Sequence, residues 1–150
     1  ETAFTNATTL AVTVTLASGS YYVRVENNDG NAGRSANAII TASTAPVWST
    51  AAGSLGTFAG DTSGTLATVA ATSDSTITYS VTSGQSDLTS ANVTLTAGTG
   101  ALATTDFGGS STTATTYNFT LRITDAEAQT VDRAFSLTSS FGATGGGQFN

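Results

Sequence analysis

The side chains that could do chemistry in this 150-residue chain are carboxylates, hydroxyls and four arginines. There is no His, no Cys and no Lys, so the commonest general base, the thiol nucleophile and the Schiff-base amine are all missing. A Ser-His-Asp triad and a Ser-Lys pair cannot be built. A paired-carboxylate glycosidase remains, but such sites usually lie in aromatic-rich clefts of larger folds. We therefore expect a protein that is not an enzyme and has no catalytic residues.

Carboxylates also bind calcium, and five aspartates fall in segments whose composition predicts turns. They are Asp29, Asp61, Asp74, Asp106 and Asp125. No dense Asp-x-Asp-x-Asn cluster accompanies them in the sequence, and Asp is common in turns because its side chain bonds the nearby backbone. We expect turn-forming roles, with no metal site and no cofactor; Ca²⁺ is the one ion worth testing.

Three Asn-x-Ser/Thr sequons are candidate glycosylation sites, at Asn6, Asn92 and Asn118. Many sequons arise by chance in a chain in which about one residue in five is Thr. The strand pattern around Asn118 directs its side chain away from the core, so a glycan would fit there.

Composition predicts an all-β protein. Thr is β-branched and suits a pleated strand, whereas Met and Lys are absent and other helix formers are scarce. Charged residues are only 9% of the chain and the net charge is −6, so nucleic acid is not an expected partner. No apolar stretch approaches the ~20 residues of a membrane helix, so we expect no membrane span. Because the sequence lacks Met even at position 1, we expect a processed product or a piece of a longer chain.

Residues 1–45 predict a short β module. Apolar residues alternate with Ala and Thr over residues 10–16, and a second strand is expected over residues 21–26. The sequence Asn-Asn-Asp-Gly at residues 27–30 predicts a hairpin turn, and a third strand is expected over residues 37–42.

The segment Ala-Pro-Val-Trp marks the expected domain boundary, because it holds the only Pro and the only Trp of the chain. Pro46 stiffens a linker. Trp48 is expected to fill a core or an inter-domain contact, and the alternative is a sugar-stacking aromatic. Both residues are candidate interface residues.

Residues 46–138 predict a complete β-sandwich, because short strands recur between turns rich in Gly, Ser and Asp. The expected strands are residues 56–58, 65–71, 76–82, 93–96, 101–103, 117–124 and 130–138. Alternation predicts one apolar face made of Tyr117, Phe119, Leu121 and Ile123, with Val131, Phe135 and Leu137 on the next strand.

Residues 139–150 form a Gly-rich tail. Its composition is typical of a flexible linker, but the isolated aromatics Phe141 and Phe149 could instead dock on a neighbouring chain. They complete the set of candidate interface residues.

Two stretches resemble known families. The sequence Tyr-Tyr-Val-Arg-Val-Glu-Asn-Asn-Asp-Gly at residues 21–30 resembles the closing half of an IPT/TIG domain. Residues 46–138 resemble cadherin-like putative-Ig modules, on the matching residues 77–84, 95–100, 117–125 and 132–136. The tandem looks like the tail-fibre or virion-appendage proteins of cyanophages and like bacterial surface fibres. It departs from the family after Ser83-Gly84, where Gln-Ser-Asp-Leu replaces the usual Leu-Pro-x-Gly-Leu.

The resemblance implies tandem Ig-like sandwiches of which the first is incomplete, because the opening strands of an IPT/TIG domain are missing. An uncovered sheet of three strands is marginally stable, and its edges can pair with another chain. Either upstream sequence is lost, or a neighbouring subunit supplies the missing strands, with residues 1–9 or the tail as donors.

These observations favour an extracellular protein on a cell or virion surface. The first hypothesis is a structural subunit of a fibre that assembles head to tail with copies of itself, with strand complementation as the way in which subunits could join. The alternative is an adhesive or carbohydrate-binding module of a larger surface protein, with cell-surface glycans as partners. A third is an accessory domain of a hydrolase.

Overall fold

The computed structural model describes residues 2–6, 9–26, 29–108 and 113–140, with side chains described from Val12 onwards. The chain divides into two compact units, which we call unit 1 (Glu1–Thr44) and unit 2 (Ala45–Asn150). Each unit is described by itself. No helix among the described residues is long and apolar enough to cross a membrane.

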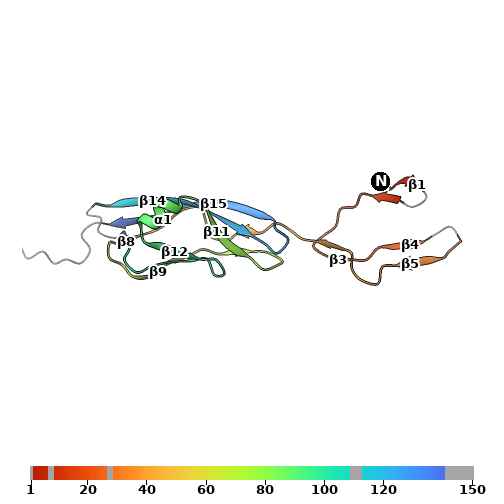
Figure 1. Ribbon diagram of the computed structural model, residues 1–150, viewed down its shortest axis with the longest axis horizontal. Helices are drawn as coiled ribbons and strands as arrows, with labels where there is room; N and C mark the ends of the chain where they lie inside the picture. Colours follow the sequence, from red (N-terminus) through yellow and green to blue (C-terminus); the bar gives the residue numbers. More distant parts are fainter. Residues whose placement is uncertain (1, 7–8, 27–28, 109–112, 141–150) are drawn as a thin grey trace, which may run out of the picture. The chain divides into compact units, whose positions relative to one another are not determined.

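Unit 1 consists of three pairs of short antiparallel strands (Figure 1). β1 (Thr2–Asn6) pairs with β2 (Thr9–Val12). β3 (Gly19–Tyr21) pairs with β6 (Ile40–Ala42), and β4 (Arg24–Glu26) pairs with β5 (Ala32–Arg34).

The last two pairs form one ribbon, because backbone hydrogen bonds continue between them. Ser35 donates to the Val23 carbonyl oxygen at 2.9 Å, and Ile39 donates to the Tyr21 carbonyl oxygen at 3.0 Å. At the end of the ribbon, the Asp29 carboxylate accepts a hydrogen bond from the Asn31 backbone N–H at 3.1 Å. The predicted reversal of the chain is confirmed, although residues 27 and 28 of the predicted turn lie outside the described part.

Three strand predictions in unit 1 need correction. The strand predicted over residues 10–16 ends at Val12, because Val12 already stands opposite Thr2 and the following residues extend beyond the pairing. The strand predicted over residues 21–26 is split between β3 and β4, and the strand predicted over residues 37–42 is limited to β6. β5 was not predicted, because Ala-Gly-Arg carries no β-branched residue and only its pairing with β4 makes it a strand.

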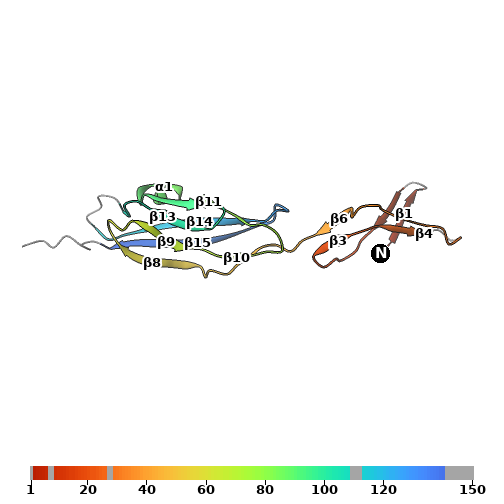
Figure 2. The ribbon, with the colours of Figure 1, turned by 90° about the horizontal axis from the view of Figure 1, so that it is seen from below.

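Unit 2 is a sandwich of two main sheets (Figure 2). The four-stranded sheet has the order β11-β14-β15-β8 and the three-stranded sheet the order β12-β13-β9. Their strands are β8 (Gly53–Ala59), β9 (Gly64–Thr68), β11 (Thr78–Ser83), β12 (Val93–Thr96), β13 (Ala101–Thr104), β14 (Thr115–Thr124) and β15 (Thr130–Ser140). β15 pairs with β8 in parallel and every other pair in these sheets is antiparallel.

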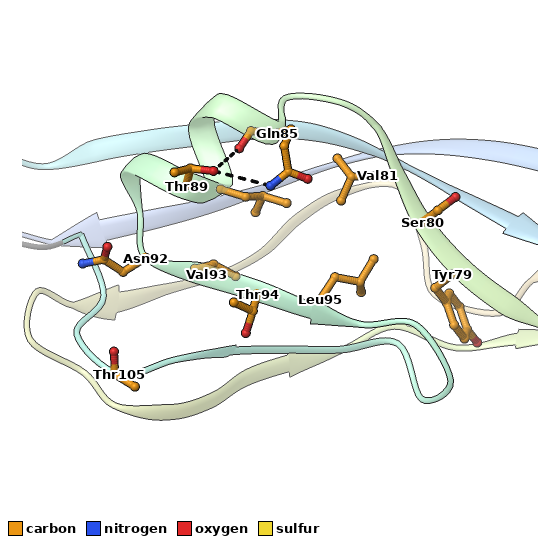
Figure 3. Close-up of a pocket in the computed structure, with 11 residues that line it drawn as sticks. Tyr79, Ser80, Val81, Gln85, Thr89, Asn92, Val93, Thr94, Leu95 and Thr105 are labelled. Carbon is orange, nitrogen blue, oxygen red and sulfur yellow. Dashed lines mark hydrogen bonds between the residues drawn. The ribbon is translucent and has the colours of Figure 1, made fainter.

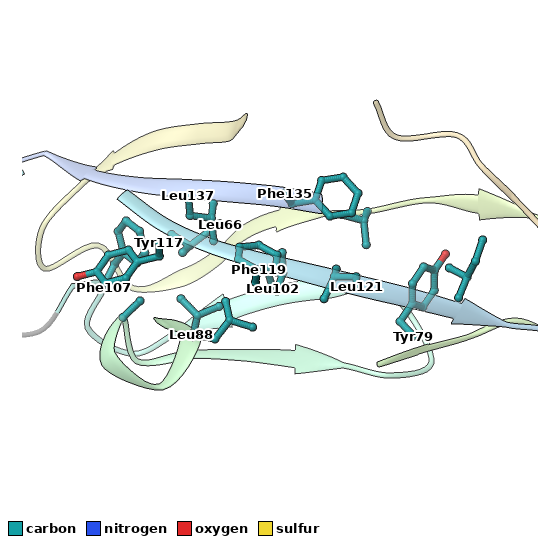
Figure 4. Close-up of a cluster of buried hydrophobic side chains, with 14 of the residues drawn as sticks. Leu66, Tyr79, Leu88, Leu102, Phe107, Tyr117, Phe119, Leu121, Phe135 and Leu137 are labelled. Carbon is teal, nitrogen blue, oxygen red and sulfur yellow. The ribbon is translucent and has the colours of Figure 1, made fainter. Parts of the chain in front are cut away.

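The core lies between the two sheets (Figure 4). The predicted face of β14 is confirmed, since Tyr117, Phe119, Leu121 and Ile123 are all buried. From β15, Phe135 and Leu137 join them and Val131 is half-buried. Leu66 and Leu102 face them from the other sheet, and burial of such side chains stabilises by about 1.5–3 kcal/mol each.

A small third pairing holds Trp48 in this core. β7 (Val47–Trp48) pairs with β10 (Ala71–Thr72). The indole of Trp48 is 5% exposed, and its ring lies 5.2 Å from Phe135 and 5.9 Å from Tyr79, between ring centres. Its N–H donates to the Val131 carbonyl oxygen at 3.1 Å, which satisfies the polar end of a buried ring.

A short helix, α1 (Gln85–Ser90), follows β11 at the position where the sequence departs from the family pattern. Gly84 precedes it with φ +76°, and a Cβ there would overlap the Asn118 carbonyl oxygen, so only glycine fits. Leu88 is buried, and the Asp87 carboxylate accepts the Asn118 backbone N–H at 3.0 Å. The helix was not predicted, because tertiary contacts rather than propensity fix these six residues.

The end of the sandwich also differs from the prediction. β15 continues through Ser139 and Ser140, which were assigned to the tail, because both stay paired with β8. Ser139 is buried. The rest of the predicted tail, residues 141–150, lies outside the described part of the chain.

Candidate interaction surface

The largest exposed apolar side chains of unit 1 define a surface that we call the unit 1 face. Its members are Val12, Val14, Tyr22, Val23, Val25, Ile39 and Ile40. Each is between 37% and 62% exposed, although each belongs to a residue type that normally lies inside a protein. Isolated exposed residues of this kind are ordinary, but seven within 29 residues of chain form a marker of an interaction site.

A hollow of about 470 Å³ lies within unit 1. Val14, Leu16, Tyr21, Val25 and Ile40 are among the side chains that line it. Most of its described lining is apolar and comes from the ribbon and from the segment around the end of β2, and the charged residues Arg24 and Glu26 also line it.

Two contacts place charge beside the unit 1 face. Arg24 forms an ion pair with Glu26 on the same strand. The Arg34 guanidinium lies over the ring of Tyr22, with 4.1 Å from Cζ to the ring centre. A cation on an exposed aromatic ring contributes about 0.5–1 kcal/mol. The two contacts hold the charged side chains in place and leave the apolar side chains of the unit 1 face exposed.

Unit 2 carries a different concave surface, a groove of about 600 Å³ between β11, β12 and α1 (Figure 3). We call it the β11–β12 groove. β11 lies at one edge of the four-stranded sheet and β12 at one edge of the three-stranded sheet. Val81, Val93 and Leu95 lie along the groove, and none of the lining residues that the structure describes is charged.

The two walls of this groove meet at one end. There the Tyr79 backbone N–H donates to the Ala97 carbonyl oxygen at 2.8 Å. At the other end stands α1, where the Thr89 hydroxyl donates to the Gln85 carbonyl oxygen at 2.9 Å. This groove was not predicted, because the helix that closes it was not predictable from residue types.

Two of the predicted sequons lie where their surroundings can be described. Asn118 is exposed on the outer side of β14. Asn92 is exposed, has φ +56°, and donates from its side-chain amide to the Asp106 carbonyl oxygen at 3.1 Å. Asn6 ends β1, and its side chain lies outside the described part. Glycosylation at the three sites stays a prediction.

The turn role expected for aspartate is seen most clearly at Asp125, which is buried. Its carboxylate accepts the Gln129 backbone N–H at 2.7 Å and the Gln129 side-chain amide at 3.1 Å. Among the described residues, no three carboxylates come together as a metal site would require. The geometry therefore supplies no argument for calcium.

Two of the four predicted interface residues lie in the described part of the chain. Pro46 and Trp48 are both buried, and the contacts of Trp48 with Tyr79 and Phe135 put its ring in the sandwich core. That placement leaves no ring face for stacking on a sugar. Phe141 and Phe149 lie outside the described residues, so their docking role stays a prediction.

The arginines on β14 and β15, Arg122 and Arg133, have different partners. Arg122 and Asp132 face each other across the strands and form two hydrogen bonds, at 2.7 and 2.8 Å. The hydrogen bond from Arg122 lowers the pKa of Asp132, and the same bond raises the pKa of Arg122. Arg133 instead donates to a backbone group, the Thr50 carbonyl oxygen, at 2.6 Å.

No family model and no curated protein sequence matches this chain. Solved structures of cadherin extracellular domains are similar to it. Protocadherin gamma B2 domains 1–5 match with a TM-score of 0.56 and 14% identity, over 82% of this chain and 31% of that chain. A protocadherin gammaB7 EC3-6 cis-dimer structure matches with a TM-score of 0.54 and 15% identity, over 65% and 26%. Human CDH23 EC21-23 matches with a TM-score of 0.51 and 18% identity, over 69% and 35%.

These likenesses define the class: this is an all-β protein with an Ig-like β-sandwich of the cadherin type. The resemblance of residues 46–138 to cadherin-like sandwiches is thereby confirmed for the fold. The chain spans between about a quarter and about a third of the length of these structures. At such low identity, the likeness extends to the fold alone. The IPT/TIG resemblance of residues 21–30 stays a prediction.

Proposed function

We propose that this chain is an extracellular, non-catalytic adhesive module that binds protein surfaces, with other copies of itself as the first partner. The observation that carries the proposal is the unit 1 face, which exposes seven large apolar side chains, three of them (Val12, Val25 and Ile40) on described strands of two-stranded sheets. A partner that covers such a face removes apolar surface from water, which is the main favourable term in association. The cadherin-like fold of unit 2 supports an extracellular setting.

Charge favours a second copy as the partner that covers the face. Unit 1 contains three acidic residues and two arginines, whereas unit 2 contains seven acidic residues and two arginines. Two copies with a net charge of −6 each repel one another, and the repulsion is smallest where the surface is almost neutral. Self-association through unit 1 therefore meets the lowest electrostatic cost.

Sedimentation velocity of the full chain over a wide concentration range tests the proposal. The parent chain should associate. Val14→Asp and Val25→Asp should each weaken the affinity of self-association about tenfold or more, because the substitution places a carboxylate in an apolar contact. Thr116→Asp, at an exposed position of β14, is the matched control and should leave association unchanged. A parent chain that is monomeric at every concentration would contradict the proposal, as would full association of both valine variants.

A structural subunit of a filament is the second candidate, in line with the resemblance to phage-appendage and surface-fibre proteins. It is favoured by the pairing pattern of unit 1, whose strands have edges at which strands of another chain could add. Negative-stain electron microscopy separates the candidates. Regular filaments of the purified chain would favour the fibre subunit, whereas small closed oligomers would favour an adhesive module of a larger surface protein.

A further inference from the structure

We propose that the β11–β12 groove of unit 2 receives residues 12–16 of a second copy of this chain as an added strand. We call residues 12–16 the donor segment. The inference rests on the proposed self-association and names the two surfaces that would meet in it. Three features carry it: the open edges of the groove, the match of its side chains to the donor segment, and the absence of charge from both.

The groove offers backbone groups that an added strand can pair with. The Tyr79 N–H points across the groove, because it bonds the Ala97 carbonyl oxygen where the two walls meet. Peptide groups alternate in direction along a strand, and the pairing of β11 with β14 is regular from Tyr79 to Val81. The N–H and C=O of Val81 therefore also point into the groove, away from β14. An extended segment lying beside β11 could bond them.

The side chains of the groove form an apolar floor with a polar rim. The half-buried Val81 and Leu95 supply apolar surface, the buried Leu88 and Val93 also line the groove, and Ser80, Gln85, Thr89, Asn92 and Thr94 add hydroxyls and amides. Such a site suits a strand that presents apolar side chains on one face and neutral polar side chains on the other.

The donor segment has this pattern. Val12, Val14 and Leu16 share one side of an extended chain, and Thr13 and Thr15 share the other. The segment is in no strand after Val12, and Val12 and Val14 are more than half exposed. Pairing in the groove would cover these valines and add only the cost of ordering a short stretch of chain.

Charge selects this chain's own segment as the occupant. The described residues that line the groove carry no charge, and the sequence has no charged residue from Thr2 to Val23. In a chain of net charge −6, contact between these two surfaces brings no carboxylate towards another. Donor and acceptor are different surfaces of the same chain, so each copy could fill the groove of the next, and such a contact extends unless its rotation closes a ring.

Disulfide trapping between two singly substituted chains tests the inference, and the absence of natural cysteine makes every cross-link assignable. A Val14→Cys chain is mixed with a Leu95→Cys chain of different mass and oxidised mildly. Cross-linking needs the two Cα atoms within about 7 Å, so a mixed dimer reports the donor segment inside the groove. We expect the yield of this mixed dimer to be at least about tenfold higher than the yield from the control mixture of Val14→Cys with Thr116→Cys, because Thr116 lies outside the groove.

Several outcomes separate this inference from the proposed function. Association by sedimentation without a Val14–Leu95 cross-link would overturn the groove assignment and leave self-association standing. A monomeric parent chain would overturn both. Trp48 fluorescence checks that Leu95→Cys is folded, and Val81→Cys on the opposite wall repeats the test if it is not.

Amide hydrogen exchange gives a readout that needs no cysteine. At concentrations at which the chain associates, hydrogen exchange of the Val81 N–H should be about tenfold or more slower than in dilute protein. This slowing is expected when the N–H forms a strand hydrogen bond, with about tenfold for each 1.4 kcal/mol. In Val14→Asp the concentration dependence should disappear. Protection that is the same in dilute parent protein, or that persists in Val14→Asp, would overturn the inference.

Discussion

Units 1 and 2 use the same alternation of apolar and polar residues but differ in what covers the apolar side. On β14, Leu121 is completely buried, because the second sheet of the sandwich packs on it. On β4, Val25 follows the same pattern and is 57% exposed. The period of two thus predicts which side chains share a face, while burial of that face depends on a partner layer.

The two units also differ in the source of their stability. Unit 2 buries an aromatic and aliphatic core within itself, so its folding needs no other chain. The described part of unit 1 consists of one strand pair and a two-stranded ribbon, and two-stranded sheets are marginally stable alone. Association would then act as part of the folding of unit 1, which explains why an apolar face can be kept exposed in a single chain.

The largest expected effect is a cavity in the core of unit 2. Phe107 is fully buried and its ring contacts Phe58 and Tyr117, with centres 6.0 and 5.9 Å away. Phe107→Ala should lower the free energy of unfolding by about 3–5 kcal/mol. Val25→Ala in unit 1 should change it by less than about 0.5 kcal/mol. Urea unfolding followed by circular dichroism, which reports the strands of both units, measures both variants, and equal losses would break the contrast between the units.

A smaller loss is expected from Gly100→Ala. Gly100 has φ +71°, and a Cβ there would overlap the Val69 carbonyl oxygen. The left-handed backbone costs about 1–2 kcal/mol for alanine and overpacking adds about 1–3 kcal/mol, so we expect a loss of about 2–5 kcal/mol. Gly64→Ala is the control, since φ is +105° but no atom lies within 4 Å. If Gly64→Ala lowers the free energy of unfolding as much as Gly100→Ala does, backbone strain alone accounts for the loss.

Removal of unit 1 should affect unit 2 little. A chain of residues 45–150 keeps the buried core residues, so its free energy of unfolding should stay within about 1 kcal/mol of the value in the full chain. The same urea experiment on dilute protein measures this, with Phe107→Ala in the shortened chain as a control for a correctly folded core. A shortened chain that does not unfold cooperatively would mean that the core of unit 2 depends on unit 1.

The smallest effect is expected from the exposed pair of Arg122 and Asp132. Because the pKa of Asp132 is lowered in the folded protein, its contribution to stability is present above the ordinary Asp pKa of about 3.9. It is lost as pH falls through the lower folded value. Asp132→Asn should therefore be slightly less stable than the parent at neutral pH and equal to it in strong acid. Thermal unfolding across this range tests the sign, and a difference that grows in acid would contradict it.

Much of unit 2 was predictable because its strands are long and their apolar residues alternate. The strand at residues 93–96 was predicted with its observed bounds, and the buried face of β14 was predicted residue by residue. In unit 1, by contrast, the predicted strand over residues 10–16 ended early because pairing, not pattern, sets the length of a strand. Trp48 lies in the sandwich core, one of the two places expected from the sequence, and only the fold decides which surface covers an indole.

The sequence by itself determined the all-β class, the scarcity of catalytic groups and the alternating faces, because these follow from residue types and a period of two. Only the tertiary structure decided which faces were covered and where the β11–β12 groove lies. The helix that closes the groove depends on a left-handed Gly84 against Asn118 and on Leu88 entering the core. Those contacts join residues about thirty positions apart, and no local pattern encodes a distance across the fold.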